Sequence, residues 1–182
     1  MQKDSEIAVE LARSRYGAYE KIFKMIEGLW EGRTIPRMDY IKAKYDQDAA
    51  RLELERYALI LERQAALVEQ YSLICSERDD KKEDLEETIW RTYLRYRKAD
   101  CDALAKGVEV AATNLEYNRE YLDNILKLRR ENFATNTQVV LAELDVELEE
   151  KSLADAKQRS SECRSELSSI DEMTAPFSPQ RQ

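Results

Sequence analysis

Apolar side chains recur at alternating spacings of three and four residues along almost the whole chain, which constrains the fold more than any other feature. In the segment 36–78 the spacing continues for about five heptads. Its positions are Tyr40, Ala43, Gln47, Ala50, Leu54, Tyr57, Leu61, Gln64, Val68, Tyr71 and Cys75. Four glycines and three prolines in 182 residues interrupt little of such a pattern. The sequence predicts an all-α protein whose long amphipathic helices pack as coiled coils.

Polar breaks divide this pattern into four helices. We expect the helices over residues 4–31, 36–78, 85–132 and 137–172. At a rise of about 1.5 Å per residue, the two middle helices would each be roughly 60–75 Å long. The predicted fold is therefore an elongated rod of four antiparallel helices, arranged as two coiled-coil hairpins over residues 1–78 and 85–172.

The breaks themselves are short. The first hairpin tip covers 32–36, where Pro36 suits the first turn of a helix and Thr34 is the expected cap. The second tip covers 132–137. The charged segment 79–84 is expected to connect the hairpins, the alternative being a continuing helix with exposed charges. Residues 173–182 are expected to be a disordered tail.

The expected second helix carries a further apolar stripe, nearly opposite the first. Its positions recur every seven residues and are Tyr45, Leu52, Leu59, Ala66 and Leu73. In a simple coiled coil this face would be charged and solvated. A helix that is apolar on two opposed faces needs neighbours on both, so we interpret these five residues as an assembly face, within a sheet of helices or a wall. The alternative is a scatter of surface apolar residues.

The composition argues against nucleic-acid binding and against the common kinds of catalysis. A net charge of −8 does not supply the basic face that phosphate contacts need. The chain has no histidine, which removes the commonest general base and zinc ligand. We therefore expect no enzyme, no cofactor and no metal site. No apolar run reaches the roughly 20 residues of a membrane-spanning helix, so we expect no direct membrane span.

The three cysteines are widely spaced and odd in number. Cys75, Cys101 and Cys163 each fall on the apolar stripe of a predicted helix. This placement favours reduced thiols packed between helices over a disulfide framework.

The two predicted hairpins superimpose when the chain is shifted by 99 residues. The positions that match in kind are Ile26 with Ile125, Leu29 with Leu128, Asp39 with Gln138, Ile41 with Val140, and Ala43 with Ala142. Identities are few, but each half contains a helix, a short polar tip and a return helix that begins with aliphatic residues. The pattern predicts a duplicated helical hairpin, the alternative being a chance alignment of two amphipathic hairpins.

The tip segments resemble the hairpin repeats of the TolC-type outer-membrane efflux protein family. In those repeats a glycine precedes a short polar stretch with Thr or Ser, then Asp, aliphatic residues and Ala. The matching residues are Gly32, Thr34, Asp39, Ile41 and Ala43 in the first tip, and Asn132, Thr135, Gln138, Val139, Val140, Leu141 and Ala142 in the second. The first tip has one residue more between Gly32 and Asp39 than the usual spacing. The family's β-strand segments and signal peptide have no counterpart in this sequence.

The resemblance implies a helical duct at the periplasmic side of the outer membrane. Three chains would stand side by side as the staves of an α-helical barrel, with the second stripe of the second helix against the next hairpin. The tips would dock the helical hairpins of a periplasmic adaptor protein. The implied tip residues are Gly32, Arg33, Thr34, Asp39, Asn132, Thr135 and Gln138. Among them, Arg33, Asp39 and Gln138 hold the positions of the family's gate.

A second interpretation has no transport role. The same helices would suit a coiled-coil scaffold or adaptor protein, monomeric or dimeric, and a chain complete from Met1 would be expected in the cytoplasm. The three gate candidates would then be ordinary surface residues, Asp39 being favoured by the dipole of the helix it begins. Oligomeric state separates the two interpretations, because the duct requires a trimer.

Overall fold

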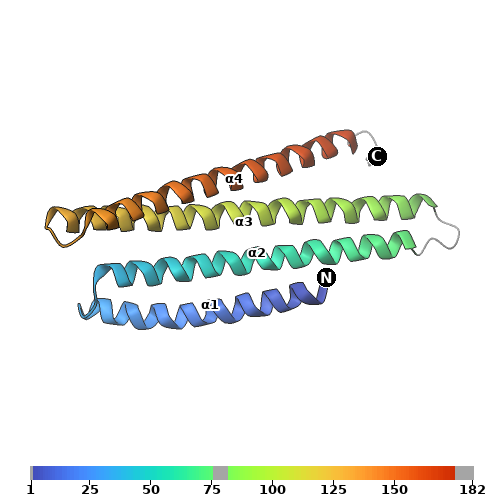
Figure 1. The fold of residues 1–182 in the computed structure, drawn as a ribbon. Helices are drawn as coiled ribbons and strands as arrows, with labels where there is room; N and C mark the ends of the chain where they lie inside the picture. The colour runs from blue at the N-terminus through green and yellow to red at the C-terminus, as the bar shows by residue number, and fades with distance from the viewer. Residues whose placement is uncertain (1, 76–81, 175–182) are drawn as a thin grey trace, which may run out of the picture.

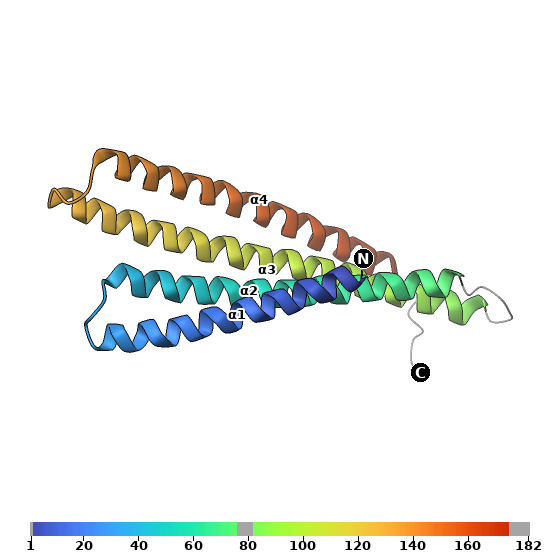
Figure 2. The same ribbon diagram turned by 60° about the horizontal axis from the view of Figure 1, so that its bottom comes forward.

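Four long antiparallel helices lie side by side in the order of the chain (Figures 1 and 2). The computed structural model describes residues 2–75 and 82–174. The helices are α1 (Gln2–Glu31), α2 (Arg37–Cys75), α3 (Lys82–Arg130) and α4 (Asn136–Thr174). Among the described residues, α1 contacts only α2, and α4 contacts only α3. The predicted all-α fold of antiparallel hairpins is confirmed, and the helices form one layer instead of a closed bundle.

The helix ends differ from the predicted ones by a few residues at most where the structure describes them. Residues 82–84, predicted to belong to the connection 79–84, form the first turn of α3. Likewise, Met173 and Thr174 of the predicted tail 173–182 are the last residues of α4. The predicted helical residues 76–78, the rest of the connection and the tail from residue 175 lie outside the described residues.

Both apolar faces of α2 have a neighbour in the same chain. Towards α1, the ring of Tyr40 lies 5.4 Å from that of Trp30. Towards α3, the ring of Tyr45 lies 5.7 Å from that of Tyr117. Leu52 and Ala66 on the Tyr45 stripe are buried, and Leu59 and Leu73 are half-buried. The five predicted assembly-face residues therefore lie on the α2 face between the two hairpins of one chain, and their role between chains stays a prediction.

The partial burial of Tyr45 has an electrostatic consequence. Burial between α2 and α3 raises the pKa of its phenol to about 12, and the adjacent carboxylates of Glu116 and Glu120 contribute to the rise. Each of these effects disfavours the phenolate. Tyr45 is neutral at physiological pH like an ordinary tyrosine, and the raised pKa keeps it neutral to a higher pH than usual.

A polar network crosses the layer in the first half of α3. Asp100 accepts from Arg63 of α2 at 2.5 Å and pairs with Arg97, one turn away on α3, at 3.5 Å. Arg97 in turn pairs with Glu166 of α4. Asp100 and Arg97 are largely shielded from solvent, so this network ties α2, α3 and α4 together through charge-assisted hydrogen bonds.

The prediction that the three cysteines are reduced thiols packed between helices was wrong. Cys101 of α3 and Cys163 of α4 form a disulfide, with their Cα atoms 5.5 Å apart, and Cys75 is free and exposed. The stripe positions of Cys101 and Cys163 were recognised correctly, since both are buried. Their pairing depends on where the second tip turns, because the turn sets which residues of the two helices lie at the same height.

Candidate partner-binding site at the hairpin tips

Both hairpin tips lie at the same end of the molecule, which we call the tip end (Figures 1 and 2). The first tip joins α1 to α2, and the second joins α3 to α4. They share an end because α2 and α3 are antiparallel neighbours, so the start of α2 lies beside the end of α3. The fold therefore brings together two segments that are about 100 residues apart in the sequence.

A Schellman motif ends α1. The backbone N–H of Arg33 donates to the carbonyl of Trp30 at 2.8 Å, and that of Thr34 donates to the carbonyl of Leu29 at 3.0 Å. Arg33 itself adopts a left-handed conformation, with φ of 55°. These two bonds satisfy carbonyls that the end of a helix otherwise leaves without partners.

The same motif ends α3. The N–H of Asn132 donates to the carbonyl of Arg129 at 3.1 Å, and that of Phe133 donates to the carbonyl of Leu128 at 2.8 Å. Asn132 is also left-handed, with φ of 61°. Every donor and acceptor of this turn lies 99 residues after its counterpart in the first tip. The sequence repeat therefore reappears as one backbone geometry formed twice.

The left-handed residue of the first tip is Arg33. The resemblance to the TolC-type repeat had instead predicted Gly32 as the turn glycine. Gly32 has a negative φ, and its N–H donates to the carbonyl of Gly28 at 3.2 Å, as in a continuing helix. Arg33 is thus the counterpart of Asn132. Asp39 and Gln138 each follow their left-handed residue by six positions, so the extra residue of the first tip exists only when the count begins at Gly32.

A capping box begins α4. The hydroxyl oxygen of Thr135 accepts from the N–H of Gln138 at 3.2 Å, and the side-chain oxygen of Gln138 accepts from the N–H of Thr135 at 2.8 Å. This reciprocal pair satisfies two donors at the start of the helix. This role of Gln138 was not predicted, although Thr-x-x-Gln before an aliphatic run is the sequence signature of a capping box.

The prediction that Thr34 caps α2 was wrong. Its hydroxyl donates to the carbonyl of Leu29 at 2.8 Å, so it completes the end of α1. α2 begins directly after Pro36, whose carbonyl accepts from the N–H of Asp39 at 3.2 Å. Thr34 is too far from the first turn of α2 for its side chain to serve as the cap, which belongs to the residue just before the helix.

The surface of the tip end combines aromatic and charged side chains. Arg33 and Asp39 are exposed, and neither forms an ion pair within the part of the chain that the structure describes. Phe133 is 77% exposed, although it was not among the predicted site residues. Its only sequence signal is that it is an aromatic residue inside a polar turn. Two rigid turns with an exposed aromatic ring and free charges suit the binding of another protein.

The left-handed position of the first tip predicts a stabilising substitution. Arg33→Gly should raise the free energy of unfolding by up to about 1 kcal/mol, because glycine adopts positive φ without steric cost. Gly32→Ala is the matched control, since its added methyl would meet neighbouring atoms at 3.5 Å or more. Urea unfolding measures both. A loss of more than about 1 kcal/mol in Gly32→Ala, with none gained in Arg33→Gly, would contradict the assignment of the turn.

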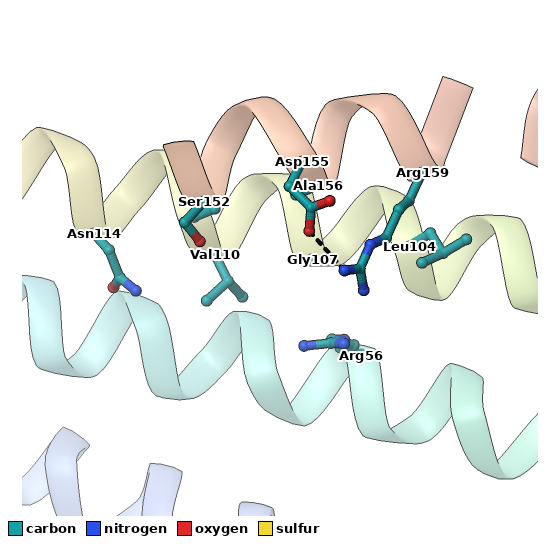
Figure 3. Close-up of a pocket in the computed structure, with 10 residues that line it drawn as sticks. Arg56, Leu104, Gly107, Val110, Asn114, Ser152, Asp155, Ala156 and Arg159 are labelled. Carbon is teal, nitrogen blue, oxygen red and sulfur yellow. Dashed lines mark ion pairs between the residues drawn. The ribbon is translucent and has the colours of Figure 1, made fainter. Parts of the chain in front are cut away.

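An open groove of about 210 Å³ lies along the middle of α3, away from the tips (Figure 3). Gly107 of α3 lies next to the side chain of Arg56 from α2. On the α4 side, Arg159 pairs with Asp155 at 2.8 Å. This ion pair neutralises part of the charge that lines the groove, and the groove is open to solvent. The lining residues therefore offer no arrangement of groups that would select a ligand.

No protein-family model, curated protein or solved structure matches this chain. Within the described residues, no helix is both long and apolar enough to cross a membrane. The same part of the chain holds no cluster of cysteine and carboxylate side chains that could bind a metal ion. Functional inference therefore depends on the geometry of the layer and its tips.

Proposed function

We propose that the protein is the helical duct portion of a TolC-like outer-membrane efflux or secretion component, which docks a periplasmic adaptor protein through its hairpin tips. The observation that carries this proposal is the pair of equivalent, rigidly closed turns at one end of the molecule. A partner with a repeated helical hairpin could meet both turns in the same way, because their backbones are alike.

With the turn at Arg33, the first tip has the usual family spacing to Asp39, while the position of the family's glycine is held by Arg33 here and by Asn132 in the second tip. Three positions after the left-handed residue, the first tip has Pro36 and the second has Thr135. Six positions after it, the two tips have Asp39 and Gln138. The alanine follows at the tenth position in both, as Ala43 and Ala142, and both alanines are buried. The two tips thus agree with each other and with the spacing of the TolC-type repeat.

Two further observations fit a periplasmic duct. A single layer of antiparallel helices is the arrangement that a barrel wall requires, since every stave needs a neighbour on each side. The Cys101–Cys163 disulfide suits an oxidising compartment such as the periplasm, whereas the cytosol keeps most thiols reduced.

Site-specific photo-crosslinking in the native cell tests the docking. A crosslinking residue at Phe133 should yield an adduct with an adaptor protein that contains helical hairpins, because this side chain is exposed at the tip end. The matched control position is Val68, exposed on α2 far from the tips. Adducts of equal yield at both positions, or adducts that contain only this chain, would contradict the proposed docking.

One observation favours the alternative of a coiled-coil scaffold without a transport role. The second stripe of α2 is already covered by α3 of the same chain, so the stripe does not by itself require a second chain. Thiol trapping in intact cells separates the alternatives. Reduced Cys101 and Cys163 would support a scaffold in a reducing compartment, and an intact disulfide would support the periplasmic duct.

A further inference from the structure

α1 carries a second apolar stripe that faces away from α2. Its positions are Ile7, Leu11, Ala18, Ile22, Met25 and Leu29, and the five large side chains among them are 44–70% exposed. The intervals of four, seven, four, three and four residues keep these positions on one face of the helix, as in a helix-packing face. A stripe of this length and exposure exceeds the scattered apolar residues normal on a surface.

The counterpart of this stripe in the second hairpin is covered. A shift of 99 residues maps it onto α3, at Lys106, Val110, Tyr117, Tyr121, Asn124 and Leu128, all of which are half-buried. α2 provides the cover: Lys106 pairs with Glu55 of α2 at 2.8 Å, and Tyr117 meets Tyr45. The outer stripe of α1 is therefore the repeat-equivalent of a surface that already binds a helix in this structure.

The complementary surface is exposed on α4. The α2 face that covers α3 includes Ile41 and Tyr45, and their counterparts on α4 are Val140 and Leu144. Val140 is 60% exposed and Leu144 47%, whereas Ile41 is buried and Tyr45 half-buried. Leu141 and Leu148 extend the same outer apolar surface of α4. α1 and α4 are the two outer helices of the layer. Each of them thus exposes one of the two surfaces that α2 and α3 bury against each other within the chain.

We infer that the outer face of α4 binds the outer α1 stripe of a second copy of this chain, in the register of the internal α2–α3 joint. Tyr45 meets Tyr117 in that joint, so Leu144 of one copy lies opposite Ala18 of the next. The contact is the chain-to-chain joint of the proposed duct, and its biological meaning rests on that proposed function. Its basis in the structure is continuity with an existing helix interface.

The apolar part of this joint is confined to the half of α4 near the tips. Further along α4, Lys151, Gln158 and Ser165 replace the α2 residues Leu52, Leu59 and Ala66 of the internal joint. Association is therefore weaker than the internal contact and depends on protein concentration. Because the two surfaces differ, the joint is head-to-tail, and successive copies close into a ring or continue as a filament according to the rotation between them.

Two charge substitutions test the joint, with mass measured by analytical ultracentrifugation across protein concentrations. Leu144→Glu should abolish association by blocking the α4 surface, and Ile22→Glu should abolish it by blocking the α1 stripe. Mixing the two variants should then produce a 1:1 heterodimer that grows no further, because each variant keeps one intact surface. Val68→Glu is the matched control and should associate like the wild type, since Val68 is exposed on α2 and belongs to neither surface.

The register has its own test. Arg37 pairs with Glu120 at 3.1 Å in the internal joint, and the corresponding residues between copies are Asn136 and Lys21. Asn136→Glu should therefore tighten association about 2- to 5-fold, and Asn136→Lys should weaken it by a similar factor. Equal effects of both substitutions, in direction and size, would overturn the proposed register.

Several results would overturn the joint itself: a wild-type protein that stays monomeric up to about 1 mM, single variants that keep the wild-type mass, or a mixture that stays monomeric. None of these measurements involves an adaptor protein. Adaptor crosslinks at Phe133 together with a monomeric mixture would refute the joint alone. Heterodimers without such crosslinks would refute the docking alone.

Discussion

Replacing Cys101 and Cys163 with serine should lower the free energy of unfolding by about 2–4 kcal/mol. The disulfide closes a loop with a sequence separation of 62 residues, so its loss restores considerable conformational freedom to the unfolded chain. The disulfide should supply much of the free energy that holds α4 on α3, because the buried side chains along α4 are small: Ala142, Ser160 and Cys163. Urea unfolding, monitored by circular dichroism, measures the change.

Cys75→Ser provides the matched control for this substitution. Cys75 is free and exposed, so its replacement should change stability by no more than about 0.5 kcal/mol. Hydrogen exchange should also show that α4 loses protection before α2 in the double serine variant. Equal stability of the double variant and the control would show that the disulfide does not hold α4 on α3.

The double substitution Leu52→Glu with Leu59→Glu should lower the free energy of unfolding by about 4 kcal/mol or more. Leu52 is only 5% exposed, so one of the new carboxylates is buried without a partner. The effect should be concentrated at the α2–α3 joint, which is the contact between the two hairpins within the described residues. Denaturant unfolding measures the loss, and small-angle scattering reports separation of the hairpins.

The control for this variant changes the same helix where it is exposed. Val68→Glu with Tyr71→Glu also adds two carboxylates to α2, but these side chains are 42% and 60% exposed. Its cost should stay below about 1 kcal/mol. A variant with Leu52 and Leu59 replaced that keeps the stability of this control would refute the packing of that α2 face.

Local pattern was sufficient to predict the helices and their repeat. The three-and-four spacing depends only on neighbours along the chain, so it located all four helices to within a few residues in the described part. The second stripe through Tyr45 and Leu52 indicated a helix with two neighbours, and the contacts of α2 with α1 and α3 agree. The shift of 99 residues was visible in the sequence because duplicated hairpins must place their tips at matching positions.

The chemistry of the tips was predicted less well, since it depends on individual backbone angles. Gly32 was the obvious candidate for the turn, yet Arg33 adopts the left-handed conformation. The position of a Schellman motif depends on which N–H groups donate to which carbonyls at the helix end. A shift of the motif by one residue leaves the local amino-acid composition almost unchanged, so the sequence alone does not locate it to one residue. For the same reason, Thr34 was assigned to the wrong helix.

The sequence by itself determined that this chain forms long helices, where they turn to within a few residues, and that one hairpin is formed twice. Those properties follow from hydrophobic periodicity and turn residues, which act over a few positions. Only the tertiary structure decided that Cys101 meets Cys163 and that α2 joins α3 within one chain. It also decided that the outer stripe of α1 and the apolar face of α4 stay open. These outcomes depend on the order and register of neighbouring helices, which no single helix encodes.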